Sequence, residues 1–279
     1  MLLAIDAGNT NVVFGVFDGD KKLCQWRAAT RPDRTADEYA VLLTQWLANE
    51  GLKVSAITDV AIASVVPTIL RDLRHLANRT FGHKPLVIGD DGVVLGLEVR
   101  IDRPAEAGSD RLCDAVAAHA TYGGPLIVID FGTATTFNVV DDKGNYRGGA
   151  IAPGINLSLE ALHQATAKLP RIAVEQPARA IGRDTISAMQ SGIYWGYIGL
   201  IEGLTRRLAK EFGGKTKIKM KMKMKVIATG GLAPLFANGT QVVDHVDTDL
   251  TLRGLVEIHR RNRSGSRKAP RKAKAKANR

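Results

Sequence analysis

The same strand–turn–strand motif occurs twice in this sequence. Residues 2–18 read LLAIDAGNTNVVFGVFD, residues 126–142 read LIVIDFGTATTFNVVDD, and six of the seventeen aligned positions are identical at an offset of 124. Each copy has an apolar run, an Asp-x-Gly turn, a second apolar run and a polar turn, which is typical of a β-hairpin. The duplication predicts two similarly folded halves. We expect the break between them at residues 122–125, Tyr-Gly-Gly-Pro.

Strand and helix patterns alternate between the two hairpins. Thr35 and Glu38 form a capping-box pattern, and apolar residues at helical spacing follow them. Residues 60–66 form a continuous apolar run, as in a buried strand, and Pro67 then opens an amphipathic helix. A further helix is expected over residues 110–121. This alternation predicts an α/β layered fold.

The positive net charge is confined to two short segments. The chain carries +11, but residues 259–279 hold ten Lys or Arg and residues 215–225 hold six Lys, so the remainder carries −5. The 259–279 segment has no large apolar side chain, so we expect a disordered tail that binds nucleic acid at most non-specifically. In the 215–225 segment Lys alternates with Thr, Ile and Met, which favours a strand over a Met-rich partner groove.

Composition excludes several classes of protein. The 279 residues include two cysteines, Cys24 and Cys113, too few for a disulfide framework or a cysteine zinc site. Apolar runs fall short of the roughly 20 residues of a membrane helix. The N-terminal sequence has an aspartate at position 6 and no basic start, so we do not expect a signal peptide. We therefore expect a cytoplasmic protein without a membrane partner.

The two Asp-x-Gly turns have the chemistry of a phosphate site. Glycine lets backbone N–H groups approach an oxyanion, and Asn9, Thr10 and Thr133 add neutral donors. Asp6 and Asp130 cannot bind phosphate directly, but they can hold cations that do. The alternative is that each Asp and Gly only makes a tight turn. After the glycine, the first copy has Asn-Thr and the second has Thr-Ala. A tight turn would not require this difference, so the difference favours a functional role for the two turns.

A third motif, Gly108-Ser109-Asp110-Arg111, precedes the 110–121 helix. Asp110 can act as a general base and Arg111 can hold an anionic substrate. The alternative is helix capping by Ser109 or Asp110. The helix N-terminus is expected to lower the pKa of Asp110.

Glycine marks three further places. Residues 148–154 and 229–231 are glycine-rich segments after strands, where a backbone can approach a nucleoside. Gly192, Gly196 and Gly203 share one face of a helix predicted over residues 183–212, which fits either a dimer contact or packing within the chain.

Together these motifs resemble the type III pantothenate kinase family. They are DAGNTNVVFGVFD at 6–18, GSDR at 108–111, DFGTATT at 130–136, GGAIAPG at 148–154, KLPRI at 168–172, IGRDT at 181–185 and ATGG at 228–231. The resemblance covers residues 1–258. It implies the fold of the acetate and sugar kinase, heat-shock chaperone and actin superfamily: duplicated actin-like (ribonuclease H-like) α/β domains with a nucleotide cleft between them. The expected halves are 1–122 and 123–258, followed by the tail.

The resemblance implies ATP-dependent phosphorylation of pantothenate to 4'-phosphopantothenate, the first step of coenzyme A biosynthesis, by a homodimer. Residues that match the ATP site are Asp6, Ala7, Gly8, Asn9, Thr10, Asn11, Val12, Val13 and Thr133. Residues that match the pantothenate site are Gly108, Ser109, Asp110, Arg111 and Thr185. Asp110 is the implied proton acceptor, Asp6 the implied Mg²⁺ site and Asp130 the implied ligand of K⁺ or NH₄⁺. Ile101 departs from the family, which often has tyrosine there.

Two other functions remain open at this stage. Another small-molecule kinase of the superfamily would need a sugar-binding carboxylate and asparagine set, which the sequence does not show. A non-enzymatic transcriptional accessory factor would bind DNA without needing Asp110.

Overall fold

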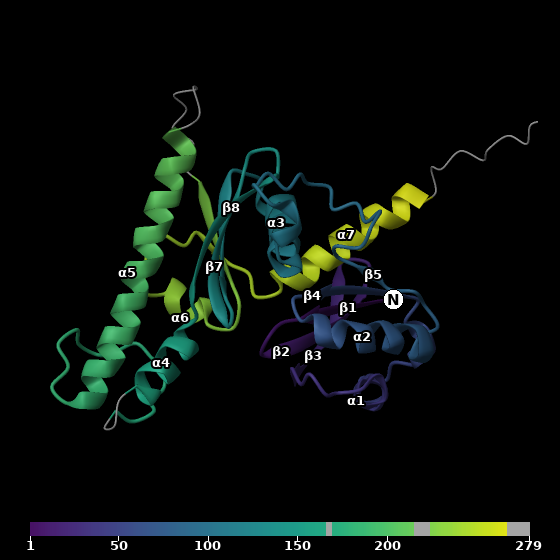
Figure 1. The fold of residues 1–279 in the computed structure, drawn as a ribbon, viewed down its shortest axis with the longest axis horizontal. Coiled ribbons are helices and arrows are strands. Elements are labelled where there is room, and N and C mark those ends of the chain that lie inside the picture. Colours follow the sequence, from purple (N-terminus) through teal and green to yellow (C-terminus); the bar gives the residue numbers. More distant parts are fainter. Residues whose placement is uncertain (166–168, 215–223, 267–279) are drawn as a thin grey trace, which may run out of the picture.

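In the computed structural model the chain forms two mixed five-stranded sheets with helices between and outside them (Figure 1). The structure describes residues 1–165, 169–214 and 224–266. The first sheet has the order β3-β2-β1-β4-β5. Its strands are β1 (Leu2–Ala7), β2 (Asn11–Asp18), β3 (Lys21–Ala29), β4 (Asp59–Ser64) and β5 (Leu86–Val87). The second has the order β10-β9-β6-β7-β8. Its strands are β6 (Leu126–Phe131), β7 (Ala134–Val140), β8 (Tyr146–Pro153), β9 (Lys225–Thr229) and β10 (His245–Val246).

The repeated motif forms the same hairpin in both sheets. β1 pairs antiparallel with β2, and β6 pairs antiparallel with β7. On the other side of each first strand lies a parallel strand, β4 beside β1 and β9 beside β6. The predicted duplicated α/β fold is therefore confirmed. Because parallel neighbours end at the same edge, both Asp-x-Gly turns lie at the carboxyl ends of parallel strands.

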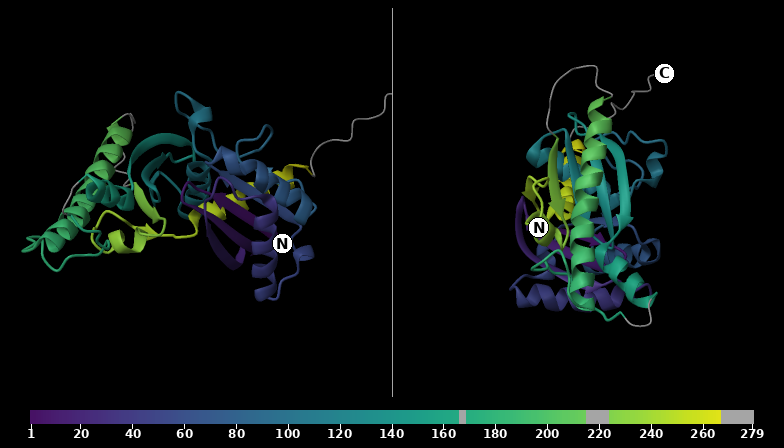
Figure 2. Two further views of the ribbon diagram at one scale, coloured as in Figure 1. Left: turned by 60° about the horizontal axis from the view of Figure 1, so that its bottom comes forward. Right: turned by 90° about the vertical axis from the view of Figure 1, so that its left-hand side faces the viewer.

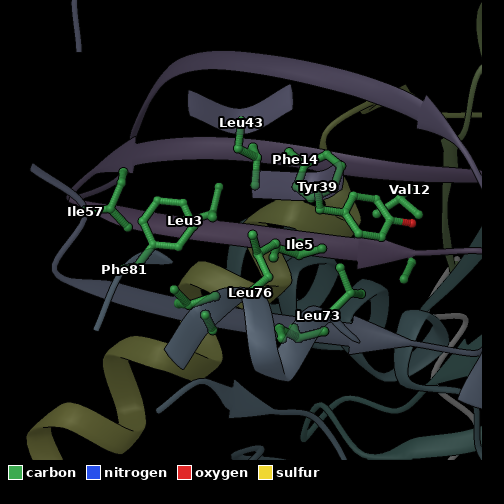
Figure 3. Packing of buried hydrophobic residues seen from close by; sticks show 14 of the residues in the cluster. Leu3, Ile5, Val12, Phe14, Tyr39, Leu43, Ile57, Leu73, Leu76 and Phe81 are labelled. Atoms are coloured by element: carbon green, nitrogen blue, oxygen red, sulfur yellow. The ribbon is translucent and has the colours of Figure 1, made fainter. Parts of the chain in front are cut away.

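The helices form three layers around the two sheets. They are α1 (Ala36–Asn49), α2 (Pro67–Thr80), α3 (Ser109–Tyr122), α4 (Ile155–Gln164), α5 (Thr185–Gly214), α6 (Ala233–Ala237) and α7 (Leu250–Ser266). Side chains of α1 and α2 pack on one face of the first sheet around Leu3, Ile5 and Phe14 (Figure 3). α5 and α6 cover the outer face of the second sheet, as both views of Figure 2 show.

α3 and α7 fill the layer between the sheets. On α3, Cys113 and Val116 belong to the core of the first sheet, whereas Leu112 and Ala115 belong to that of the second. α7 comes from the end of the chain, yet Leu252 and its neighbours pack under the first sheet. Both halves of the sequence therefore contribute to the layer that joins the two sheets.

Several local predictions are confirmed. The Thr35–Glu38 capping box is present at α1, and Pro67 is the first residue of α2. α3 covers the predicted 110–121 helix, and Gly123 ends it with a φ of 71°. β5 has only two residues, Leu86 and Val87.

The basic segment departs from its prediction. α7 continues through residues 259–266, which composition had assigned to the disordered tail. His259 lies 3.3 Å from Asp59, and Nη1 of Arg261 donates to the Leu95 carbonyl at 2.6 Å. Composition could not reveal these partners, because they come from distant parts of the chain. Residues 267–279 lie outside the described residues.

The strand predicted in the lysine-rich segment 215–225 is largely untested. Residues 215–223 also lie outside the described part, whereas Met224 is buried and Lys225 begins β9. Within the described residues, no helix is long and apolar enough to cross a membrane.

Candidate active site

The two repeated turns face each other across the gap between the sheets. The hydroxyl oxygens of Thr10 and Thr133 lie 2.6 Å apart and share a hydrogen bond. Each turn has an internal backbone bond of its own span: Gly8 N–H donates to the Asn11 carbonyl three residues on at 3.0 Å, and Gly132 N–H donates to the Ala134 carbonyl two residues on at 3.1 Å. The duplication therefore builds two similar loops, the second one residue shorter, and brings their tips together.

Three carboxyl groups converge beside these loops. Asp6 is near the end of β1, Asp130 near the end of β6, and Asp110 in the first turn of α3. Burial, followed by the charges of Asp110 and Asp130, raises the pKa of Asp6 to about 8 against an opposing effect of Arg27. Burial and then Asp110 raise the pKa of Asp130 to about 7. The crowding of these groups disfavours their charged forms.

This donor set suits a cation. A bound cation offsets the repulsion between buried carboxylates, and hard cations prefer oxygen ligands. Within the described chain no three His, Cys, Asp or Glu side chains cluster closely enough to form a metal site alone. The remaining ligands would therefore come from water and from a phosphate-bearing ligand.

The glycine-rich segment after β9 touches Asp130. A Cβ on Gly230 would lie 2.7 Å from Oδ1 of Asp130 and 2.7 Å from the Phe131 carbonyl oxygen, and its φ is +90°. Only glycine fits this position without strain. The 229–231 segment thus belongs to the wall around Asp130.

Asp110 and Ser109 do not cap α3. The N-cap is Gly108, which has no side chain, and the Ser109 hydroxyl is buried without a hydrogen-bond partner. Oδ1 of Asp110 accepts from the Arg111 backbone N–H at 2.7 Å. The capping interpretation is therefore wrong for the N-cap position. The Asp110 carboxylate instead accepts from backbone N–H groups inside the first turn, its own and that of Arg111.

The expected pKa direction for Asp110 is also wrong. Burial raises its pKa, and this outweighs the lowering by the Arg111 and Asp110 backbone N–H groups and the Arg111 charge. The sequence showed the helix N-terminus but not the depth of the side chain. A raised pKa makes Asp110 a better proton acceptor than the sequence indicated.

Arg111 is held by two residues that the sequence analysis missed. Its Nε donates to Oδ1 of Asn138 at 2.7 Å, and its guanidinium carbon lies 5.5 Å from the centre of the Tyr146 ring. Asn138 is fully buried on β7. The pairing register makes Gly15 its equivalent in the first copy, because Ala4 pairs with Gly15 as Val128 pairs with Asn138. A polar residue inside the apolar run at 137–140 was the available signal. Ile101 packs in the same core cluster as Tyr146.

Ala7, Val12 and Val13 contribute mainly backbone to the first loop, because Ala7 and Val12 are a buried pair across β1 and β2.

Thr185 lies apart from the other predicted site residues. It is exposed at the start of α5, and α5 and α3 pack on opposite faces of the second sheet. The structure therefore brings Asp6, Thr10, Asp110, Arg111, Asp130 and Thr133 to one region, but not Thr185.

A family model described as type III pantothenate kinase matches residues 2–207. The chain belongs to this family. It is 62% identical to the type III pantothenate kinase of Paramagnetospirillum magneticum over 94% of this chain and 98% of that protein. It is 59% identical to the one of Rhodospirillum rubrum, over 94% and 99%. As a member of this family the chain is a kinase, and it phosphorylates pantothenate with ATP.

Solved structures support the fold. A conserved putative Baf family transcriptional activator from Campylobacter jejuni aligns with a TM-score of 0.58 at 21% identity, over 94% of this chain and 99% of that one. A putative 2-dehydro-3-deoxygalactonokinase from Sinorhizobium meliloti aligns with a TM-score of 0.52 at 13% identity, over 98% and 99%. At these identities the likeness concerns architecture alone.

Proposed function

We propose that Asp110 is the general base of the pantothenate kinase reaction. The observation that carries this role is the convergence of Asp110 with the two Asp-x-Gly loops. Its carboxylate accepts the proton of the pantothenate hydroxyl as that oxygen attacks the γ-phosphorus of ATP. ADP leaves, and 4'-phosphopantothenate is the product. Because phosphoryl transfer depends mainly on positioning and charge, a modest base in the right place suffices.

The ATP phosphates lie, in this proposal, against residues 6–13 and Thr133. Backbone N–H groups of the loop and the Thr10 hydroxyl serve as donors, and Asp6 would hold Mg²⁺. That ion would neutralise developing charge on the phosphates. Asp130 would hold a monovalent cation, K⁺ or NH₄⁺, because its buried carboxyl group faces other carboxyl groups rather than a cationic side chain.

The acceptor lies against Gly108, Ser109, Asp110 and Arg111. The guanidinium of Arg111 pairs with the carboxylate of pantothenate, and this fixes the other end of the molecule. The hydroxyl to be phosphorylated then lies near Asp110. Bidentate pairing between arginine and a carboxylate supplies both affinity and orientation.

We further propose that α5 forms a homodimer contact. A Cβ on Gly192, Gly196 or Gly199 would meet nothing within 4 Å, and Trp195 between them is 37% exposed. This open helix face allows close approach of a second copy. Thr185 can then contact pantothenate only from the neighbouring protomer, because the second sheet separates it from Arg111 in its own chain. Mixed dimers of Asp110→Asn and Thr185→Ala protomers should regain activity that neither variant has alone.

The decisive experiment is an ADP-release assay with pantothenate and a panel of sugars. Asp110→Asn should lower kcat by about 10²–10⁴-fold and leave the folded state intact. Asp102→Asn, at an exposed carboxylate, is the matched control. A folded Asp110→Asn enzyme with near-full activity would remove Asp110 from the mechanism, and phosphorylation of a sugar instead would favour another kinase of the superfamily.

The cation has its own test. Activity should need K⁺ or NH₄⁺ and fall in Na⁺-only buffer, and Asp130→Ala should lose this response along with most activity. Equal rates with and without K⁺ would contradict the role of Asp130. The reaction is expected in the cytoplasm, where ATP is available.

A further inference from the structure

We propose that Asn138 and Tyr146 are positioning residues that hold Arg111 ready for the acceptor's carboxylate, and thereby make the enzyme selective for a carboxylate-bearing acceptor. This inference rests on the proposed function, in which Arg111 pairs with that carboxylate. It adds two residues that neither touch the phosphates nor take part in proton transfer.

The amide of Asn138 has one orientation that satisfies both of its ends. Its Nδ2 donates to the Thr136 hydroxyl at 3.1 Å, so its Oδ1 points to Arg111 and accepts from Nε at 2.7 Å. Asn138 is fully buried, and Thr136 is 8% exposed. A buried acceptor that receives a charge-assisted hydrogen bond is a strong constraint on the side chain that donates to it.

Tyr146 fixes the guanidinium from a second direction. Its ring is 1% exposed and lies with its centre 5.5 Å from the guanidinium carbon. The backbone around it is tied down, because its N–H donates to the Glu98 carbonyl at 2.9 Å and its carbonyl accepts from Arg100 at 2.8 Å. A rigid aromatic ring beside the cation adds a favourable cation–π contact.

These contacts leave the recognition edge of Arg111 available. A guanidinium has five N–H donors, and Asn138 takes the one on Nε. Within the described residues, no protein acceptor takes a hydrogen bond from Nη1 or Nη2 of Arg111. Those two groups form the fork that binds a carboxylate in bidentate fashion. Because the fork is held in place beforehand, binding loses less side-chain entropy.

The same contacts keep Arg111 away from its neighbour Asp110. The two residues are adjacent in sequence, yet within the described chain no ion pair joins their side chains. If the guanidinium were not held, it could form an ion pair with the Asp110 carboxylate. Neither the base nor the anion-binding group would then be available to the substrate. Asn138 and Tyr146 therefore keep Arg111, which binds the acceptor's carboxylate, apart from the proton acceptor Asp110.

The test compares two acceptors: pantothenate, and the same molecule with its carboxylate reduced to an alcohol. The measured quantity is the ratio of kcat/KM for the two. Arg111→Met should lower this ratio strongly. Asn138→Leu and Tyr146→Leu should each lower it about tenfold, as expected for loss of one contact to a charged group, while activity on the alcohol changes little. Tyr146→Phe keeps the ring but loses the hydroxyl that donates to Oδ1 of Asn138 at 3.5 Å, so it should lower the ratio less than Tyr146→Leu does.

Two further results distinguish a failure of the proposed function from a failure of this inference. If Arg111→Met leaves the ratio unchanged, the proposed function is wrong at Arg111. If Arg111→Met lowers it but Asn138→Leu and Tyr146→Leu reduce activity on both acceptors equally, their role is merely structural and the inference is overturned. Should Asn138→Leu not fold, the comparison of Tyr146→Leu with Tyr146→Phe decides. In the Arg111→Met background, Asn138→Leu should cause no further change in the ratio.

Discussion

Gly254 on α7 packs directly against the backbone of α3. A Cβ at this position would lie 2.2 Å from the carbonyl oxygen of Cys113 on α3, and 2.5 and 2.7 Å from its carbonyl carbon and Cα. Ordinary contact begins near 3.4 Å, so Gly254→Ala requires the helices to separate by about 1.2 Å. The obstructing atoms are backbone, and they cannot turn aside as a flexible side chain could.

The expected consequence reaches the N-terminal end of α3, where the proposed general base lies. Overpacking of this kind costs about 1–3 kcal/mol, although alanine recovers up to about 1 kcal/mol through its better helix propensity. Asp110 and Arg111 lie within one turn of Cys113, so moving α3 displaces them. Since a 1 Å misplacement can cost about a hundredfold in rate, we expect kcat/KM to fall tenfold to a hundredfold.

The assay is thermal or urea unfolding together with ADP release. Gly213→Ala is the matched control, because Gly213 is also helical but a Cβ there would meet nothing within 4 Å. It should be neutral or slightly stabilising, with unchanged kinetics. If Gly254→Ala matched this control in both stability and kcat/KM, the argument that α3 and α7 are rigidly packed would be refuted.

Two further predictions concern parts of the chain outside the reacting groups. Asp114 is buried and accepts from the Thr251 hydroxyl at 2.8 Å, and burial raises its pKa well above 3.8. Its protonated form is favoured in the folded state relative to the unfolded chain, so the free energy of unfolding falls as pH rises above about 4, by up to about 1.4 kcal/mol per pH unit. Asp114→Asn should flatten this slope in urea titrations, and an unchanged slope would contradict it. Truncation after Ser266 should preserve kcat and abolish salt-sensitive nucleic-acid binding, whereas truncation after Ile258 should also lower the melting temperature, because it removes the contacts of α7 with residues 59 and 95.

Features determined by neighbouring residues could be predicted from the sequence. The two hairpins follow from an apolar run, a glycine turn and a second apolar run, and the start of α1 follows from the Thr35–Glu38 box. Asp6 and Asp130 could be placed at equivalent strand ends because the repeat aligns them. In these cases the determining contacts lie within about 20 residues.

Features determined by distant residues could not be predicted from the sequence. The extension of α7 through residues 259–266 depends on Asp59 and Leu95, far earlier in the chain. The pKa of Asp110 depends on burial that only the assembled layers create. The role of Asn138 required knowing that β7 passes beside the start of α3.

Equivalent positions of the duplication have taken different roles. Gly15 in the first copy pairs with Ala4, as Asn138 pairs with Val128 in the second, and a Cβ on Gly15 would lie 2.9 Å from Leu252 of α7. Asn138, its counterpart, instead accepts a hydrogen bond from Arg111, whose helix belongs to the first half of the sequence. β7 begins directly after Thr133 and contains Asn138, so one short segment joins the second Asp-x-Gly turn to the contact with Arg111. In the proposed function Thr133 contacts the ATP phosphates and Arg111 binds the acceptor, so the stiffness of this strand would help to set the distance between the two substrates.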